Sequence, residues 1–300
     1  MAGSGGVDNI AIGYRAGVDM KQRYNIAIGI GAFSSSAGTE NVALGVQSME
    51  NSPGNFNIAI GNTSQALSKG NYNIGIGKGT LAGTSADHIT AIGYEALFRN
   101  RTGAANTALG NTAMSFNTTG SNNTAVGDST MHNNLTGGSN TGIGFHALFR
   151  NVSGNSNTAN GTSTMYNNTS GSQNTAYGVD ALFSNTTGSQ NTGNSVNSLM
   201  SNTTGSFNTA SGNNSLFLNS TRLANSAFRY NTLFDNTTGE KNIAFGYTKS
   251  ANATASCSGL IRLYASETLN AVISGSGSVL YAGNPLVQSS LSGSGGVVRL

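Results

Sequence analysis

Cysteine, proline, tryptophan and charged residues are scarce in this sequence. Its 300 residues include one cysteine, two prolines and no tryptophan, and only 8% of positions are charged. A single cysteine has no intrachain partner, which excludes a small fold held together by disulfides. The shortage of charged residues excludes a long coiled coil. The chain is instead rich in glycine and asparagine, with 42 and 41 residues.

Long apolar runs are also missing. No run approaches the length of a transmembrane helix, so we expect no membrane insertion. Residues 1–7 contain neither a basic region nor an apolar stretch, and we expect no secretory signal peptide. The formal net charge is +3, from 14 cations and 11 anions scattered along the chain. This dispersed charge gives no indication of nucleic-acid binding.

A pentapeptide of the form Asn-Ile/Thr-Ala-x-Gly recurs through most of the chain. Its first residue, the anchor, returns with a period of sixteen from Asn9 to Ile89 and of seventeen from there to Asn242. A disordered chain needs a biased composition but no fixed register. Because this register never slips, the sequence predicts an all-β fold. We expect a parallel β-roll or β-solenoid of about fifteen coils over residues 9–255.

Two apolar columns run through the predicted coils. Large aliphatic residues such as Leu182 recur eight positions after the anchor, and aromatic residues recur one position later. Consecutive residues of a strand point to opposite faces, so we expect the aliphatic column in the core and the aromatic column outside. The coil length fits two facing strands of about five residues. Segments of the form Asn-Thr-Thr-Gly predict turns with positive φ at asparagine and glycine.

The outward aromatic column predicts association between chains. A core of alanine and glycine opposite one Leu or Met buries little apolar area, and monomers rarely leave such a stripe in water. We therefore expect a homotrimeric fibre. The alternative is that the rings lie flat on the surface of a monomer. The predicted interface residues are Phe98, Phe149, Tyr166, Phe183, Phe217 and Phe234.

The repeat register ends near Gly246, and residues 256–300 follow a different pattern. Apolar residues alternate there, and the Ser-Gly-Ser-Gly of residues 274–277 returns at residues 292–295. These features predict strands that cap the last ladder edge. Binding residues concentrate in loops on rigid scaffolds, so we also expect receptor contact in this segment. The candidates are Arg262, Tyr264, Tyr281 and Asn284, and the alternative is that they only cap the ladder and join the chains.

The repeats resemble those of known adhesive proteins. The pentapeptides at residues 9–13, 25–29, 57–61 and 123–127 resemble the head repeats of trimeric autotransporter adhesins, which implies a parallel β-roll that is stable as a trimer. The later coils, such as residues 123–139 and 174–190, look like repeats of bacteriophage tail fibres. Residues 273–285 and 291–295 are similar to the end of the adhesin-head domain called GIN, which implies a β cap.

Departures from the adhesin pattern favour a virion protein. Autotransporter repeats are usually shorter than the repeats of this chain, and the sequence shows no signal peptide, coiled-coil stalk or membrane barrel. We expect a phage tail fibre that is assembled in the host cytoplasm and becomes part of the virion tail. Residues 1–8 would attach it to other tail or baseplate proteins, and its receptor would be a host-surface saccharide or protein. A bacterial surface or secreted adhesin is the alternative.

No catalytic or metal-binding motif stands out. The histidines His88, His132 and His146 have no fixed partner in the repeat, and the carboxylates are dispersed. The glycine-serine runs lack the lysine of a phosphate-binding loop. We expect no enzyme activity, cofactor or metal. An enzyme stays an alternative, as does an ice-binding solenoid that uses the threonine column at residues 107, 124, 141, 158, 175, 192 and 209.

Overall fold

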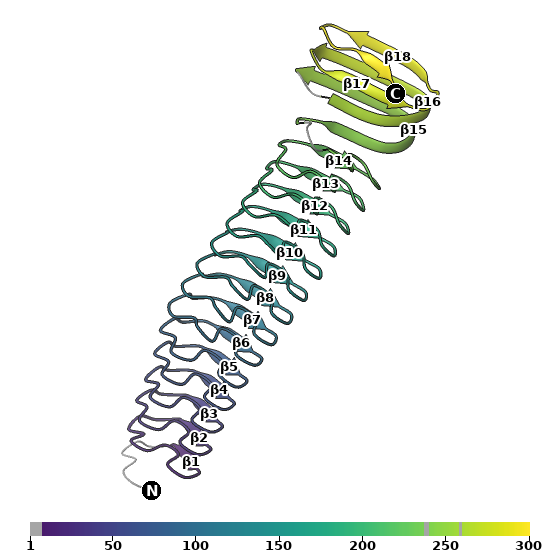
Figure 1. The fold of residues 1–300 in the computed structure, drawn as a ribbon. Coiled ribbons are helices and arrows are strands. Elements are labelled where there is room, and N and C mark those ends of the chain that lie inside the picture. Colours follow the sequence, from purple (N-terminus) through teal and green to yellow (C-terminus); the bar gives the residue numbers. More distant parts are fainter. Residues whose placement is uncertain (1–7, 237–239, 258–259) are drawn as a thin grey trace. The chain divides into compact units, whose positions relative to one another are not determined.

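The computed structural model confirms an all-β parallel solenoid, with about 16 turns (Figure 1). The structure describes residues 8–236, 240–257 and 260–300, without the side chains of residues 247–257 and 274. None of these described residues is helical, so they contain no helix long and apolar enough to cross a membrane. The chain forms two units, Met1–Thr162 and Ser163–Leu300. Residues 1–7 of the expected attachment segment lie outside the described residues.

The described part of the first unit contains one three-residue strand for each pentapeptide. Neighbouring strands pair in parallel at the same repeat position, as Ile10 does with Ile26. The partners are one coil apart, so Ile74 pairs with Thr90 and Thr90 with Thr107. The strands are β1 (Ile10–Ile12), β2 (Ile26–Ile28), β3 (Val42–Leu44), β4 (Ile58–Ile60), β5 (Ile74–Ile76), β6 (Thr90–Ile92), β7 (Thr107–Leu109), β8 (Thr124–Val126), β9 (Thr141–Ile143) and β10 (Thr158–Asn160).

The second unit begins with the same short coils and continues into longer strands. Leu260 pairs with Ser278 and Thr268 with Leu286, so β16 contacts two later strands at an 18-residue spacing. We call residues 260–300 the cap. The strands are β11 (Thr175–Tyr177), β12 (Thr192–Asn194), β13 (Thr209–Ser211), β14 (Ser226–Phe228), β15 (Ile243–Cys257), β16 (Leu260–Gly275), β17 (Ser278–Ala282), β18 (Leu286–Leu291) and β19 (Val297–Arg299).

Two buried columns form the core of the short coils. One is the central alanine or glycine of each strand from β2 to β14, such as Ala176, and the other is the aliphatic column that the sequence predicts to be the core. That prediction is confirmed, because these side chains are fully buried. In the first unit they are Leu81, Leu97, Met114, Met131 and Leu148, and in the second Met165, Leu182, Leu199 and Leu216.

The side of the coil opposite the short strand differs from our expectation of a second strand. It consists of turns in which every second residue has a positive φ, such as 55° at Asp180 and 53° at Leu182. This alternation directs Leu182 inward and Phe183 outward. The aliphatic column is therefore inside and the aromatic column outside, as predicted, although the backbone here is not an extended strand. A left-handed leucine costs about 1 kcal/mol or more. Burying its side chain contributes about 1.5–3 kcal/mol, which offsets that strain.

Positive φ at the Asn-Thr-Thr-Gly segments is a second expectation that proves wrong. Neither Asn185 nor Gly188 has the left-handed conformation. Glycine is needed there for a different reason, since a Cβ at Gly188 would collide with the carbonyl oxygen of Gly205 in the next coil. The turn residues are therefore selected by the close stacking of coils rather than by φ.

The anchor asparagines form a buried ladder along the coils. The Oδ1 atom of Asn41 accepts a hydrogen bond from the backbone N–H of Asn57 at 2.9 Å. The Nδ2 atom of Asn57 donates to the carbonyl of Gly70 at 3.0 Å. These bonds satisfy amide groups that would otherwise cost about 1–3 kcal/mol each to bury. The anchor residue is therefore asparagine because it must both accept and donate between coils.

The change of repeat length coincides with a second asparagine ladder. In three of the five 16-residue coils this position is a serine, and the Ser52 hydroxyl donates to the carbonyl of Gln65. In the other two it is Met20 and Thr84. In the 17-residue coils it is an asparagine three residues before a glycine. The Nδ2 atom of Asn117 donates to Asn100 Oδ1 at 2.6 Å and to the Gly120 carbonyl at 2.9 Å. We attribute the seventeenth residue to the longer amide, which needs a longer turn to reach its own glycine.

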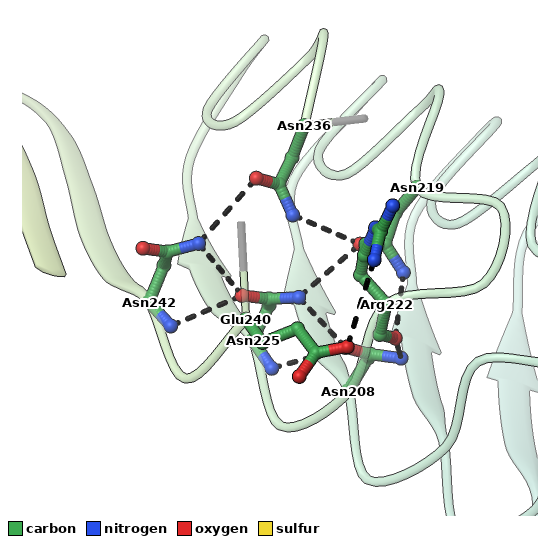
Figure 2. A network of polar contacts seen from close by, with 7 residues as sticks. All are labelled: Asn208, Asn219, Arg222, Asn225, Asn236, Glu240 and Asn242. Carbon is green, nitrogen blue, oxygen red and sulfur yellow. Dashed lines mark hydrogen bonds and ion pairs between the residues drawn. The ribbon is translucent and has the colours of Figure 1, made fainter. Parts of the chain in front are cut away.

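Figure 2 shows where the two ladders meet near the end of the short coils. Arg222 stands at the glycine position, and its carbonyl accepts bonds from Asn208 at 2.8 Å and Asn219 at 3.2 Å. Asn225 donates to Asn219 Oδ1 at 3.2 Å, which joins the ladders directly. The Arg222 guanidinium lies 3.8 Å from a Glu240 carboxylate oxygen. Because both side chains are partly exposed, this ion pair contributes little stability.

Candidate functional site

The buried face of the sheet changes sides between β15 and β16. Residues in register on adjacent parallel strands point to the same face. Ala244 of β15 is buried, whereas its partner Arg262 of β16 is exposed. Conversely, Phe245 is 39% exposed and its partner Leu263 is buried. The core therefore lies on one face of the sheet at β15 and on the other at β16.

A separate hydrophobic core fills the cap. It consists of alternating residues of β16 together with Val279 of β17, and half-buried Tyr281 packs against it. Tyr281 pairs with Leu263, which places it on the core face. The alternation begun by Ile261 continues into β17, so Tyr281 lies on the core face and is half-buried, whereas we expected it among the exposed residues. Its receptor role stays a prediction. The buried β16 members are Ile261, Leu263, Ala265, Leu269, Ala271 and Ile273.

The change of face leaves an open cavity beside the last short coil. Leu233 belongs to the aliphatic core column, but it is only half-buried, whereas Leu216 one coil earlier is fully buried. Leu233 lines a cavity of about 460 Å³ together with Arg262 and Tyr264. We call this the end cavity. Its other aromatic and charged lining residues are Tyr230, Phe234, Asp235 and Phe245.

The end cavity combines aromatic rings with a cation and an anion. Aromatic rings can cover the apolar faces of a ligand, and a guanidinium offers five N–H donors in a rigid fork. Arg262 is exposed and Tyr264 is half-buried, so both side chains are accessible from solvent. This arrangement can bind a polar group and orient it.

The structure brings only part of the predicted site together. Arg262 and Tyr264 line the end cavity, whereas Tyr281 lies on the opposite face of the sheet and exposed Asn284 does not line the cavity. Tyr230 and Asp235, which belong to the repeat that begins at Asn225, were not predicted from the sequence. A signal was present, because Arg229 replaces the glycine that usually ends the pentapeptide.

The predicted interface aromatics form half-buried ladders. The rings of Tyr166 and Phe183 stack with centroids 5.2 Å apart, and those of Phe217 and Phe234 with centroids 4.8 Å apart. Phe149 is likewise half-buried, and Phe98 is 37% exposed. Each stacked ring covers part of its neighbour, so the stripe is less exposed than we expected. The interface role of these residues stays a prediction.

A second apolar surface lies on the outward face of β1 to β6. The residues on both sides of each central alanine or glycine point outward, and Ile58 and Ile60 are 38% and 37% exposed. We call this surface the aliphatic face. Its other members are Ile10, Ile12, Ile26, Ile28, Val42, Leu44, Ile74, Ile76 and Ile92.

Two histidines that we expected to lack partners both pack against the aromatic ring of Phe149. His132 and His146 lie with ring centroids 5.2 Å and 4.7 Å from that of Phe149. Burial lowers the pKa of His146. Hydrogen bonds from Ser129 and then Asn111 lower the pKa of the nearby Asp128. Within the described residues, no group of three or more His, Cys, Asp or Glu could hold a metal ion.

Comparison with known proteins shows that the end of the repeats and part of the cap are similar to one known family. Residues 234–285 match the family model described as "Putative auto-transporter adhesin, head GIN domain". The expected similarity to the GIN head is therefore confirmed at residues 273–285, and the match begins earlier in the chain than we predicted, whereas residues 291–295 lie outside it. No curated protein and no solved structure matches the chain. The matched segment includes Arg262 and Tyr264 and supports an adhesin-like function.

Proposed function

We propose that this chain is an adhesin whose cap contacts a cell surface. The observation that carries the proposal is the end cavity, where Phe234, Arg262 and Tyr264 gather within the segment that matches the adhesin-head family. Binding groups held by a rigid β scaffold suit recognition of a receptor saccharide or protein. In this proposal the chain acts by binding alone, without catalysis, cofactor, metal, nucleic acid or membrane insertion.

Within this function, we propose a phage tail fibre. The resemblance of the 17-residue coils to tail-fibre repeats supports this version. The fibre would be assembled in the host cytoplasm, joined to tail or baseplate proteins through its N-terminal end and carried on the virion. A bacterial surface adhesin is the second candidate, favoured by the family match at residues 234–285. Neighbouring tail genes would support the fibre, and neighbouring export genes would support the surface adhesin.

A homotrimer is part of the same proposal. The aliphatic face and the aromatic ladders would both gain from contact with further copies, since each fully buried isoleucine contributes about 1.5–3 kcal/mol. Three chains also multiply weak receptor contacts into avidity.

Light scattering tests the trimer and should give a mass of three times 30.4 kDa. Ile58→Lys with Ile60→Lys should lower the mass, whereas Thr158→Lys with Asn160→Lys, at the same positions of β10, should not. A folded wild-type monomer at micromolar concentration contradicts the proposal.

Adsorption of labelled protein to bacterial cells tests the receptor role of the cap. Arg262→Ala and Tyr264→Ser should each lower adsorption by about tenfold, which is the loss of roughly 1.4 kcal/mol of binding energy. Arg299→Ala is the matched control, because Arg299 is exposed on the opposite face of the same sheet. If both cavity variants adsorb as wild type does at unchanged melting temperature, the cap only closes the ladder and recognition lies elsewhere.

A further inference from the structure

A cationic hollow lies on the first unit, where the 16-residue coils give way to the 17-residue coils. Lys69, Ser85, Arg99 and Arg101 are among its lining residues, and its volume is about 690 Å³. It shares no lining residue with the end cavity. The hollow is therefore a separate feature that the proposed function does not use.

The repeat geometry explains why the hollow exists. Lys69, Ser85 and Arg101 occupy one position in three successive coils, and the Ser85 N–H donates to the Arg101 carbonyl at 2.8 Å. Gly83 and Arg99 share the position two residues earlier. A Cβ at Gly83 would meet no atom within 4 Å. The small residues of the middle coil thus leave a gap that long cationic side chains flank on both sides.

The charge of the hollow is uniformly positive. Lys69, Arg99 and Arg101 are exposed, and in the described part of the chain no acidic residue lines the hollow and no ion pair involves these three side chains. Three of the 14 cations in the whole sequence therefore meet at one place. The Arg99 guanidinium lies 4.4 Å from the ring centroid of Phe116. This cation–π contact restrains the guanidinium before any ligand binds.

Asp87, the acidic residue of the middle coil, already accepts hydrogen bonds from a neighbouring coil. Asp87 follows Ser85 by two residues, and its Oδ1 atom accepts hydrogen bonds from the backbone N–H and the Nδ2 atom of Asn71, at 2.7 Å and 3.2 Å. Those bonds hold the carboxylate in a polar ladder with Asn71. Because Asp87 is not among the lining residues, an anion that enters the hollow would meet three cationic side chains first.

We propose that this hollow binds an anionic group on a cell-surface polysaccharide, namely a phosphate, sulfate or carboxylate carried by a sugar. Lys69, Arg99 and Arg101 would give charge-assisted hydrogen bonds, which are about twice as strong as neutral ones. An anionic group on a sugar fits the hollow better than a nucleic acid does. Proteins that bind single-stranded nucleic acids usually have aromatic rings that stack with the bases. In the described structure, no aromatic residue lines the hollow.

Titration of the full chain with dextran sulfate, polygalacturonate and uncharged dextran tests this site. We expect binding of at least one charged polymer and no binding of dextran. Arg99→Gln with Arg101→Gln should weaken binding by tenfold or more, where tenfold corresponds to about 1.4 kcal/mol. Lys78→Gln is the matched control, because Lys78 belongs to the same unit, lies 5.9 Å from the ring centroid of Tyr94 and is outside the hollow. It should change affinity by less than about twofold.

A second variant separates a defined site from diffuse attraction. Ser85→Leu keeps all three cations but fills the hollow, so it should weaken binding as strongly as the double arginine variant. If Ser85→Leu does not fold, Gly83→Asn fills the same hollow, since asparagine tolerates the φ of 75° at that position. Retained affinity in the filled variant, or equal loss in Lys78→Gln, would overturn the proposal. So would failure to bind either charged polymer, or equally tight binding of a single-stranded DNA of matched charge.

Discussion

Ala244 and Arg262 pair in register on neighbouring strands, yet Ala244 is buried and Arg262 is exposed. This relationship marks the point where the core of the short coils ends and that of the cap begins. Leu216 is fully buried, whereas Leu233 of the next coil is only half-buried and lines the end cavity. The candidate binding site is thus a product of how the repeat is terminated.

The core column should be intolerant of charge. Leu182→Asp should lower the free energy of unfolding by several kcal/mol, because the buried carboxylate has no partner. The backbone cannot be the cause, since aspartate tolerates the left-handed conformation better than leucine does. Ser189→Asp, in a half-buried turn, should keep the melting temperature near that of wild type. Equal melting temperatures for the two variants would show that the assigned faces are reversed.

Replacing one core glutamine should stabilise the first unit. Gln65 is fully buried at the position that Met49 and Leu81 occupy in neighbouring coils, and in the described structure its Oε1 atom has no hydrogen-bond partner. Gln65→Met should therefore raise the free energy of unfolding by about 1 kcal/mol, measured in urea. Gln47→Met is the control, because Gln47 is exposed and has a similar φ. A destabilised Gln65→Met protein would mean that the two bonds donated by its amide outweigh the orphaned oxygen.

The second asparagine ladder should be needed for stability. Asn202 is fully buried and donates to Asn185 Oδ1 at 2.8 Å and to the Gly205 carbonyl at 2.9 Å. Asn202→Ala leaves these acceptors without that donor, so it should cost about 1–3 kcal/mol of unfolding free energy. Asn213→Ala, on a half-buried surface, should cost much less. Similar losses in both variants would assign no special role to the ladder.

Acid should weaken the region around His146. Because burial lowers the pKa of this imidazole below its ordinary 6.5, the folded state favours the neutral form. Its contribution to stability is therefore complete above pH 6.5 and is lost as the pH falls through the lowered folded-state pKa. Between about pH 8 and pH 5, the melting temperature of wild type should fall more than that of His146→Asn. Parallel curves would mean that this imidazole does not titrate differently on folding.

The features that repeat were predictable, and the features that interrupt the repeat were not. The spacing of Leu182 and the anchor asparagines was enough to predict the coils, their register and the core, because each pattern recurs many times. The left-handed backbone at Leu182 was hidden, since leucine has no preference for positive φ. The face on which Tyr281 lies was not predictable, because the sequence gives no sign of which face is buried beyond β15.

The candidate sites show the same limit. Arg262 and Tyr264 were found because they lie in the segment that breaks the repeat. Tyr230 and Asp235 lie inside a repeat, where the departure at the neighbouring Arg229 was the signal. The cationic hollow depends on Lys69 and Arg101, which are separated by two full repeats in the sequence. The stacking of the coils brings Lys69 and Arg101 to the same hollow, on either side of the small side chain of Ser85.

The asparagine ladders also bear on how the chain is made. Each of the anchor bonds described here, such as that from Asn57 to Asn41, joins residues only one coil apart, so a coil can fold as soon as its own residues leave the ribosome. Every finished coil then presents its Oδ1 acceptors as a template for the next. Until the cap is synthesised, the growing end is an uncovered strand edge of the kind that promotes aggregation. A chain truncated before residue 260 should therefore fold its shaft and then polymerise end to end.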